Sequence, residues 1–240
     1  MDHSPFFFAT EIVGENILIE GADARHLSVV RRAKVGDGVT VCDGRGSVHR
    51  CEIVSIKDVV VEVRRVSSTY VERPSPRLTV FQALPKGSKP DSIVQKLVEV
   101  GVERIVLFKA ERAAVRWDER SAARNIERLQ LIALQAAKQS RRTWLPEVEL
   151  GPPTFQGSDG HLCLVAHEGS DIPLRQALPK DEPPTISLIV GPEGGFTDSE
   201  VDRFVASGAK QVLLGPHILR TETAAIVCAS LVLFFYGALG

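Results

Sequence analysis

The 240-residue sequence lacks the local motifs of common nucleotide-binding and hydrolytic enzymes. It has no G-x-x-x-x-G-K-[ST] segment, so a P-loop is excluded at the level of the motif. Residues 191–196, GPEGGF, do not have the G-x-G-x-x-G spacing of a dinucleotide site. There is also no G-x-S-x-G nucleophile elbow. Classical use of NAD or ATP, or of a serine nucleophile on such an elbow, is therefore not expected.

Cysteine is sparse and scattered, with no C-x-x-C pair among Cys42, Cys51, Cys163 and Cys228. All four are interpreted as reduced, mostly buried thiols of a cytoplasmic protein. A zinc site from Cys42, His49 and Cys51 would have an unusual spacing and no fourth ligand. The six histidines form no H-E-x-x-H pattern. No metal site is expected.

Membrane and export signals are also absent. The chain begins Met-Asp-His-Ser, without the basic and apolar segments of a signal peptide. Residues 224–239 form the longest apolar run, which is shorter than the roughly 20 residues that span a bilayer. We interpret this run as a buried helix at a subunit interface and expect no membrane association.

The net charge of −1 conceals an asymmetry along the chain. Residues 73–150 carry 15 Lys/Arg and 9 Asp/Glu, whereas residues 151–240 carry 5 and 10. The basic middle third suits an anionic partner such as nucleic acid. A solvated helical face explains the same charges.

The chain is expected to form two domains, residues 1–72 and residues 73–240, separated by a segment containing Pro74 and Pro76. The first domain is predicted to be a small β-barrel with one helix, residues 23–32, which Asp23 caps. Leu27, Val30 and Val29 would form the apolar side of that helix. Strands are expected at residues 6–9, 16–19, 38–42, 48–56 and 59–66.

In the second domain strands alternate with helices, which predicts an α/β fold with a parallel sheet covered on both faces. Thr197 and Glu200 are expected to form a capping box at the start of one helix. Gly101 is the expected C-terminal cap of another. Loops are predicted at residues 85–90 and 146–159, strands at 78–84, 104–108, 162–166, 186–190 and 211–214, and helices at 91–100, 118–140, 171–178, 197–207 and 221–237.

Two loops rich in glycine and proline follow the last two predicted strands. Because ligands bind outside the carboxyl ends of strands in open α/β sheets, loops after neighbouring strands would form a crevice. Two ordinary strand-to-helix turns fit the spacing equally well. His167 and His217 should lie at converging strand ends, as a catalytic pair, as ligand contacts or as plain polar loop residues.

The eliminated motifs leave a reaction that needs mainly positioning, and methyl transfer from S-adenosylmethionine is one. Several segments, in order and spacing, resemble the bacterial family of 16S ribosomal RNA (uracil-N3) methyltransferases, of the knotted SPOUT superfamily. They are ARHLSVVR (24–31), VGD (35–37), DGRG (43–46), KG (86–87), QKLVEVGV (95–102), ER (111–112), QAAKQS (135–140), PE (146–147), GPEGG (191–195) and LGPHILRTETA (214–224).

The resemblance implies a PUA-like RNA-binding barrel followed by a SPOUT domain whose parallel sheet carries a deep trefoil knot. It also implies a cytoplasmic homodimer that binds S-adenosylmethionine in the knot and releases S-adenosylhomocysteine. The substrate would be 16S ribosomal RNA in the small subunit or a late precursor. Two segments depart from the family pattern. Ser4-Pro5 replaces a common arginine, and Arg141 stands where members often have glycine.

The resemblance assigns the cofactor to loops of the second domain. The expected cofactor-binding residues are His167, Glu168, Gly191, Pro192, Glu193, Gly194, Leu214, Gly215, Ile218, Leu219 and Thr223. Arg220 is the candidate catalytic residue, which would stabilise negative charge on the uracil oxygens. Glu222 would orient Arg220 or receive the proton, or it would only cap the last helix.

Seven basic residues are the candidate RNA contacts, although each also fits a solvated surface charge. They are Arg25, Arg31, Arg32, Lys86, Lys89, Arg141 and Arg142. Two other functions remain open: a non-catalytic RNA-binding assembly factor with the same fold, and a methyltransferase acting on another RNA such as transfer RNA.

Overall fold

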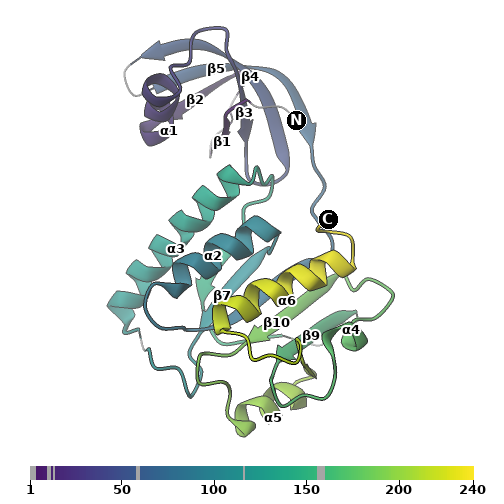
Figure 1. The fold of residues 1–240 in the computed structure, drawn as a ribbon. Helices are drawn as coiled ribbons and strands as arrows, with labels where there is room; N and C mark the ends of the chain where they lie inside the picture. Colours follow the sequence, from purple (N-terminus) through teal and green to yellow (C-terminus); the bar gives the residue numbers. More distant parts are fainter. Residues whose placement is uncertain (1–3, 10–11, 13, 58–59, 116, 156–159) are drawn as a thin grey trace. The chain divides into compact units, whose positions relative to one another are not determined.

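The computed structural model describes residues 4–9, 12, 14–57, 60–115, 117–155 and 160–240, which form two compact units (Figure 1). The first unit comprises Met1–Arg73 together with Ala137–Leu145. The second comprises Pro74–Ala136 and Pro146–Gly240. These units differ from the expected domains, 1–72 and 73–240, mainly in residues 137–145.

The first unit contains a five-stranded sheet in the order β1-β3-β4-β5-β2. The β1–β3 pair is parallel and the other pairs are antiparallel. Two irregularities in the β4–β5 register interrupt the ladder and increase its twist. The alternating residues Ile17, Ile19, Val61 and Val63 fill the core from opposite strands. The strands are β1 Phe6–Phe8, β2 Asn16–Glu20, β3 Gly38–Cys42, β4 Ser47–Lys57 and β5 Val60–Tyr70. Val59, the expected start of β5, lies outside the described residues.

The helix expected at residues 23–32 is instead a short α-helix, α1 Gly21–Arg25, followed by a π-helical turn, η1 His26–Val30. Leu27 is buried as predicted, but Val29 and Val30 are exposed, so their assignment to the apolar side is wrong. The π-helical turn has more residues per turn than an α-helix. The side chains after Leu27 are therefore rotated away from the core.

Asp23 was expected to cap this helix, and that prediction is also wrong. The helix begins at Gly21 after Glu20, which makes no side-chain capping hydrogen bond. Asp23 lies inside the first turn, and its Oδ2 accepts a hydrogen bond from Lys138 Nζ at 2.6 Å. Its carboxylate thus connects α1 to the segment Ala137–Leu145 of the same unit.

The second unit contains a six-stranded sheet in the order β11-β9-β10-β6-β7-β8, in which every pairing is parallel. This confirms the predicted parallel sheet. Its inner strands are apolar on both faces because helices cover both. The strands are β6 Arg77–Ala83, β7 Arg104–Phe108, β8 Glu147–Leu150, β9 His161–Ala166, β10 Thr185–Val190 and β11 Lys210–Val212.

Helices α6 and α2 pack against each other, and α6 lies over β6 and β10 (Figure 1). On the other face, Phe81 and Ile189 pack with Phe196 and with Val201 of α5. Helix α2 ends at Gly101, whose φ of +113° confirms the predicted C-terminal cap. The helices are α2 Lys89–Val100, α3 Glu119–Gln139, α4 Leu174–Ala177, α5 Asp198–Ala206 and α6 Thr221–Phe235. The helix expected at residues 171–178 is thus reduced to α4. Within the described ranges, no helix is long and apolar enough to cross a membrane.

Residues 146–159 were expected to be a loop, but Glu147–Leu150 form the edge strand β8, paired with β7. Val148 is buried, whereas Glu147 and Glu149 both form ion pairs with Arg104. The strand has only four residues, and of its two apolar side chains Val148 is buried whereas Leu150 is exposed, which leaves a weak signal in the sequence. Residues 156–159 of the expected loop lie outside the described residues.

Gly101 gives a test of the α2 terminus. We expect Gly101→Ala to lower the free energy of unfolding by about 1 kcal/mol, because a Cβ disfavours positive φ. Space is not the reason, since the added Cβ would lie 3.6 Å from Leu233 Cδ1. Gly151→Ala is the matched control, with ordinary φ and a nearest neighbour at 4.0 Å. Urea denaturation measures both, and equal losses would contradict the explanation.

Candidate functional site

Three loops meet at the carboxyl edge of the parallel sheet. They follow β9, β10 and β11, and comprise residues 166–169, 191–197 and 213–220. The two loops singled out from the sequence were expected after neighbouring strands. In the structure β9 lies between β10 and β11. The loop after β9, which carries His167 and Glu168, therefore completes the site.

These loops line two adjoining cavities that share Ala166, Glu168, Ile218, Leu219 and Ala224. The first has a volume of about 130 Å³ and the second about 260 Å³. The first is also lined by His167, Leu213, Leu214, Gly215, Pro216 and His217. The second is also lined by Val190, Gly191, Pro192, Glu193, Gly195, Phe196, Arg220 and Thr221.

Most of the expected cofactor-binding residues therefore line one or both cavities, but Gly194 and Thr223 line neither. Thr223 is exposed on α6. Gly194 faces the loop after β7, since a Cβ there would lie 3.3 Å from Arg112 Cβ. Both cavities are also lined by Ala166 and Ala224, which were not among the expected residues. They carry no polar side-chain group, so only their place at the end of a strand and within the motif 214–224 could have indicated them.

A buried chain of hydrogen bonds connects β6, the loop after β10 and the start of α6. Thr221 Oγ1 donates to Gly191 O at 2.5 Å and accepts from Gln82 Nε2 at 2.9 Å. Gln82 is fully buried in β6 and also donates to Ala83 O. A buried polar group without a partner would be costly, so these groups fix one another's positions. The first residue of α6 is thereby held at the mouth of the second cavity.

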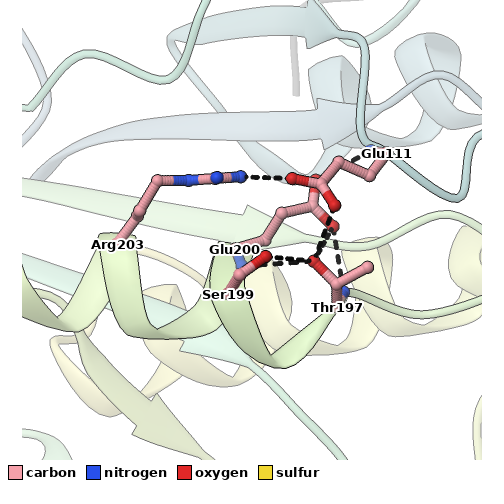
Figure 2. A network of polar contacts seen from close by, with 5 residues as sticks. All are labelled: Glu111, Thr197, Ser199, Glu200 and Arg203. Carbon is pink, nitrogen blue, oxygen red and sulfur yellow. Dashed lines mark hydrogen bonds and ion pairs between the residues drawn. The ribbon is translucent and has the colours of Figure 1, made fainter.

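The far end of the loop after β10 is fixed by the predicted capping box of α5 (Figure 2). The Glu200 backbone N–H donates to Thr197 Oγ1, and Glu200 Oε2 accepts from the Thr197 N–H at 2.9 Å. The other oxygen, Glu200 Oε1, accepts from the Glu111 N–H at 2.8 Å. Glu111 also accepts from Thr197 Oγ1 and from Arg203 Nη2. The pKa of Glu111 is held below its usual value, mainly by the hydrogen bond from Arg203.

The side chain of Arg112, the next residue, contacts main-chain carbonyl groups of the same loop. Its Nη1 donates to Phe196 O at 3.0 Å and approaches Gly194 O at 3.4 Å. These contacts turn two loop carbonyl groups toward the guanidinium. The pair Glu111-Arg112 thus fixes the loop from outside the cavities. Apart from the family motif, nothing in the sequence indicated these contacts.

Lys89 was expected to contact RNA, but its ammonium group lies between two carboxylates. Nζ is 2.8 Å from Glu193 Oε1 and 3.2 Å from Glu222 Oε2. These contacts, first that with Glu193, raise the pKa of Lys89. Partial burial opposes ionisation of both carboxyls, but hydrogen bonds from Lys89 and backbone N–H groups lower the pKa of each. The cluster is therefore ionised at neutral pH.

Arg220 is exposed at the N-cap position of α6, where it lines the second cavity. It makes no capping hydrogen bond through its side chain. Glu222, in the first turn, has a pKa that its own backbone N–H, Lys89 and Arg220 all lower against the effect of burial. A carboxylate there also interacts favourably with the helix dipole. Glu222 is thus both a helix-terminus group and the electrostatic partner of two cations.

The four cysteines are not activated as nucleophiles. All four cysteines are buried and free, and burial raises the pKa of Cys163 and Cys228 to about 12. Across the described part of the chain, no cluster of three or more His, Cys, Asp or Glu could hold a metal ion. His217 is exposed and lines the first cavity, while His167 packs against Gly169.

The capping box gives a prediction for the loop that lines the second cavity. Thr197→Ala should lower the free energy of unfolding by about 1 kcal/mol, because the α5 terminus loses its cap. Ser199→Ala is the control, since the contact of Ser199 with this network is a hydrogen bond with the Thr197 hydroxyl, outside the capping box itself. Both are measured by urea denaturation. An unchanged Thr197→Ala variant would show that Glu200 and Glu111 hold the loop without the hydroxyl.

Comparison with known proteins gives the context of this site. Residues 72–233 match a family model described as an RNA methyltransferase domain, and residues 19–64 match an RNA methyltransferase PUA domain. Ribosomal RNA small subunit methyltransferase E of Bacillus subtilis is 34% identical over 88% of this chain and 87% of its own. The Synechocystis enzyme of that name is 32% identical over 90% of this chain and 72% of its own.

A solved structure agrees with these matches. The methyltransferase E of Neisseria gonorrhoeae, bound to S-adenosyl methionine, superposes with a TM-score of 0.83 at 26% identity. The match covers 97% of this chain and 98% of that one. The chain therefore belongs to the RNA methyltransferase family that includes ribosomal RNA small subunit methyltransferase E.

Proposed function

We propose that the protein transfers the methyl group of S-adenosylmethionine to N3 of a uridine in 16S ribosomal RNA and releases S-adenosylhomocysteine. The observation that carries the proposal is the pair of adjoining cavities at the carboxyl ends of β9, β10 and β11, in a chain of this family. The names of the relatives support small-subunit ribosomal RNA as the substrate. In our proposal this RNA is methylated within the small subunit or a late precursor. The resemblance of the motifs supports uracil N3.

The residues around the cavities fit S-adenosylmethionine. The shared lining has apolar side chains for the adenine, Ile218 and Leu219 among them, and one carboxylate, Glu168, for the cationic groups. Gly195 has a φ of +65°, and a Cβ there would lie 3.1 Å from Glu168 Oε1. Glycine therefore keeps the loop close to that carboxylate. His167, Leu214 and Gly215 would complete the first cavity, and Gly191, Pro192 and Glu193 the second.

S-adenosylmethionine supplies an activated methyl group, so the protein's own task is to position the uracil and stabilise the loss of its N3 proton. Arg220 lies beside the second cavity, where its guanidinium can stabilise negative charge on a uracil oxygen. Glu222 is a poor proton acceptor, because Lys89 and Arg220 hold its pKa below the usual value. We therefore assign Glu222 the other expected role, which is to orient Arg220 by electrostatic attraction.

The proposed RNA contacts are cations of each unit, taken separately. Arg25, Arg31 and Arg32 are exposed on the first unit, and Lys86 on the second. Arg141 is exposed with a φ of +56°, and its Nη2 donates to Ser4 O at 2.7 Å. Arg142 is half-buried and makes further contacts. Lys89 is removed from this set, because its charge is neutralised by Glu193 and Glu222.

The trefoil knot and the homodimer are part of the same proposal. Residues 213–220 run from β11, past the end of β9, to α6 over β6 and β10, a path that supports a knot. An apolar groove of about 810 Å³ between α4, the loop after β11 and the end of α6 supports a subunit interface. Phe234 at its rim is 67% exposed. Cytoplasmic localisation follows from a ribosomal substrate.

Deletion of the gene should remove 3-methyluridine from 16S ribosomal RNA, and the wild-type gene should restore it. A gene that encodes Arg220→Ala should not restore 3-methyluridine. The variant should have a kcat lower by about 100-fold or more, because negative charge on the uracil oxygen is no longer stabilised. Mass mapping of ribosomal nucleosides measures the first result. Calorimetry should show S-adenosylmethionine binding to the variant within about threefold of wild type, since Arg220 acts on the base.

Arg77→Ala is the matched control for Arg220, because Arg77 is an exposed arginine at the amino end of β6, opposite the cavities. Full activity of Arg220→Ala would refute the assigned role. Loss of 3-methyluridine from transfer RNA alone would support the other substrate class. Absence of S-adenosylmethionine binding by the wild-type protein would support a non-catalytic assembly factor.

The groove beside α6 gives a prediction about assembly. Phe234→Glu should convert the protein from dimer to monomer at micromolar concentration, because a carboxylate would be buried without a partner. Light scattering after size exclusion measures the mass. Val205→Glu is the control, an exposed apolar residue on α5 outside this groove. A wild-type protein that is monomeric at all concentrations would contradict the interface.

A further inference from the structure

The segment Ala137–Leu145, which ends α3 and continues beyond it, belongs to the first unit. It contributes three cations, Lys138, Arg141 and Arg142, and no acidic residue. Residues 1–73 alone carry 10 Lys/Arg and 11 Asp/Glu, whereas the complete unit carries 13 and 11. The segment therefore changes the sign of the unit's charge.

Trp144 anchors this segment and is itself fixed in place. Its Nε1 donates to Val71 O at 3.0 Å, and the Gly46 N–H donates to Thr143 O at 3.1 Å. A Cβ on Gly46 would lie 2.9 Å from ring atoms of both Trp144 and Tyr70. Both rings thus rest directly on the backbone of Gly46, which no larger residue could replace without displacing them.

The two rings lie among arginines. Tyr70 meets Trp144 edge to face, with ring centroids 6.2 Å apart at an angle of 81°. The Arg73 guanidinium carbon lies 5.1 Å from the Trp144 ring centroid. Arg45 is exposed and forms an antiparallel bridge with Trp144 through the main chain. Tyr70 is 59% exposed although its ring is large and its position fixed.

We propose that Tyr70, Trp144, Arg73 and Arg45 form a stacking platform for an unpaired base of single-stranded RNA. The proposal rests on the proposed function, because it assigns a second contact to the RNA substrate. Aromatic rings and guanidinium planes are the groups on which proteins stack unpaired bases. The flanking arginines then pair with the adjoining phosphates.

The local charge favours RNA over a protein partner. Residues 44–46, 70–73 and 141–145 contain four arginines and a single acid, Glu72. The nearby Asp43 uses its carboxylate to accept the Arg45 and Ser47 backbone N–H groups. Anchoring of the segment accounts for Trp144, but it leaves unexplained why Tyr70 presents an exposed ring beside these cations.

The protein contains only two tryptophans, so its own fluorescence can report on the platform. Trp117 belongs to the second unit, and Trp117→Phe leaves Trp144 as the single tryptophan. Titration of this full-length variant with a uridine-rich single-stranded 12-mer should quench its emission. A duplex of the same length, whose bases are already stacked, should quench it much less.

In the same background, Tyr70→Ala should weaken binding of the single strand by about 5- to 100-fold, as loss of one stacked base predicts. Tyr70→Phe should bind normally because it keeps the ring. Val66→Ala is the matched control, an exposed residue on the same strand β5. The free energy of unfolding of the Tyr70 variants, measured by urea denaturation, should match that of the parent. Weaker RNA binding would then reflect the lost stacking of a base and not a displaced segment 137–145. Arg45→Ala should also reduce the salt dependence of binding.

Two results would overturn the platform: binding of RNA without a response from Trp144, or unchanged affinity of Tyr70→Ala in a protein that still methylates ribosomal RNA. In both cases the proposed function would stand. A wild-type protein that neither binds nor methylates ribosomal RNA would overturn the proposed function together with the platform. Methyl-transfer assays on the same preparations distinguish these cases.

Discussion

The hydroxyl group of Thr221 joins the end of β10 to the first residue of α6, and the rest of the site depends on that bond. Thr221 donates to Gly191 O, and its oxygen accepts a hydrogen bond from Gln82, which is buried in β6. The central strands thereby determine where α6 begins. Since Arg220 and Glu222 flank Thr221, the same contacts determine where both residues lie, and they place Arg220 in the lining of the second cavity.

Around this buried link, charged groups hold the loop after β10 from three sides. Arg112 donates a hydrogen bond to a carbonyl group of the loop, and Glu200 accepts one from Thr197 at the far end of the loop. Lys89 forms an ion pair with Glu193 near the start of the loop. Each of these partners comes from a different part of the chain. A glycine-rich loop has high conformational freedom when isolated, so several independent contacts are needed to give it one shape.

The sequence predicted those parts of the molecule whose cause is local. The capping box of Thr197 and Glu200, the cap at Gly101 and the strand Arg104–Phe108 depend on neighbours within a few residues, and all three were confirmed. Strand order depends on contacts between distant segments, so the place of β9 between β10 and β11 could not be foreseen. For the same reason the ion pairs of Lys89 could not be predicted, since its two carboxylate partners lie more than 100 residues away in the sequence.

The short edge strands of the second unit bear on how copies of the molecule associate. A sheet edge exposes unpaired main-chain groups and invites pairing with another sheet, unless it is short or charged. Here β11 has three residues, and β8 has four, two of them glutamates held by Arg104. Neither edge offers a long apolar template for fibre-like growth. The groove beside α6, proposed above as the subunit interface, has no such open repeat, because contact between identical faces would close after two copies.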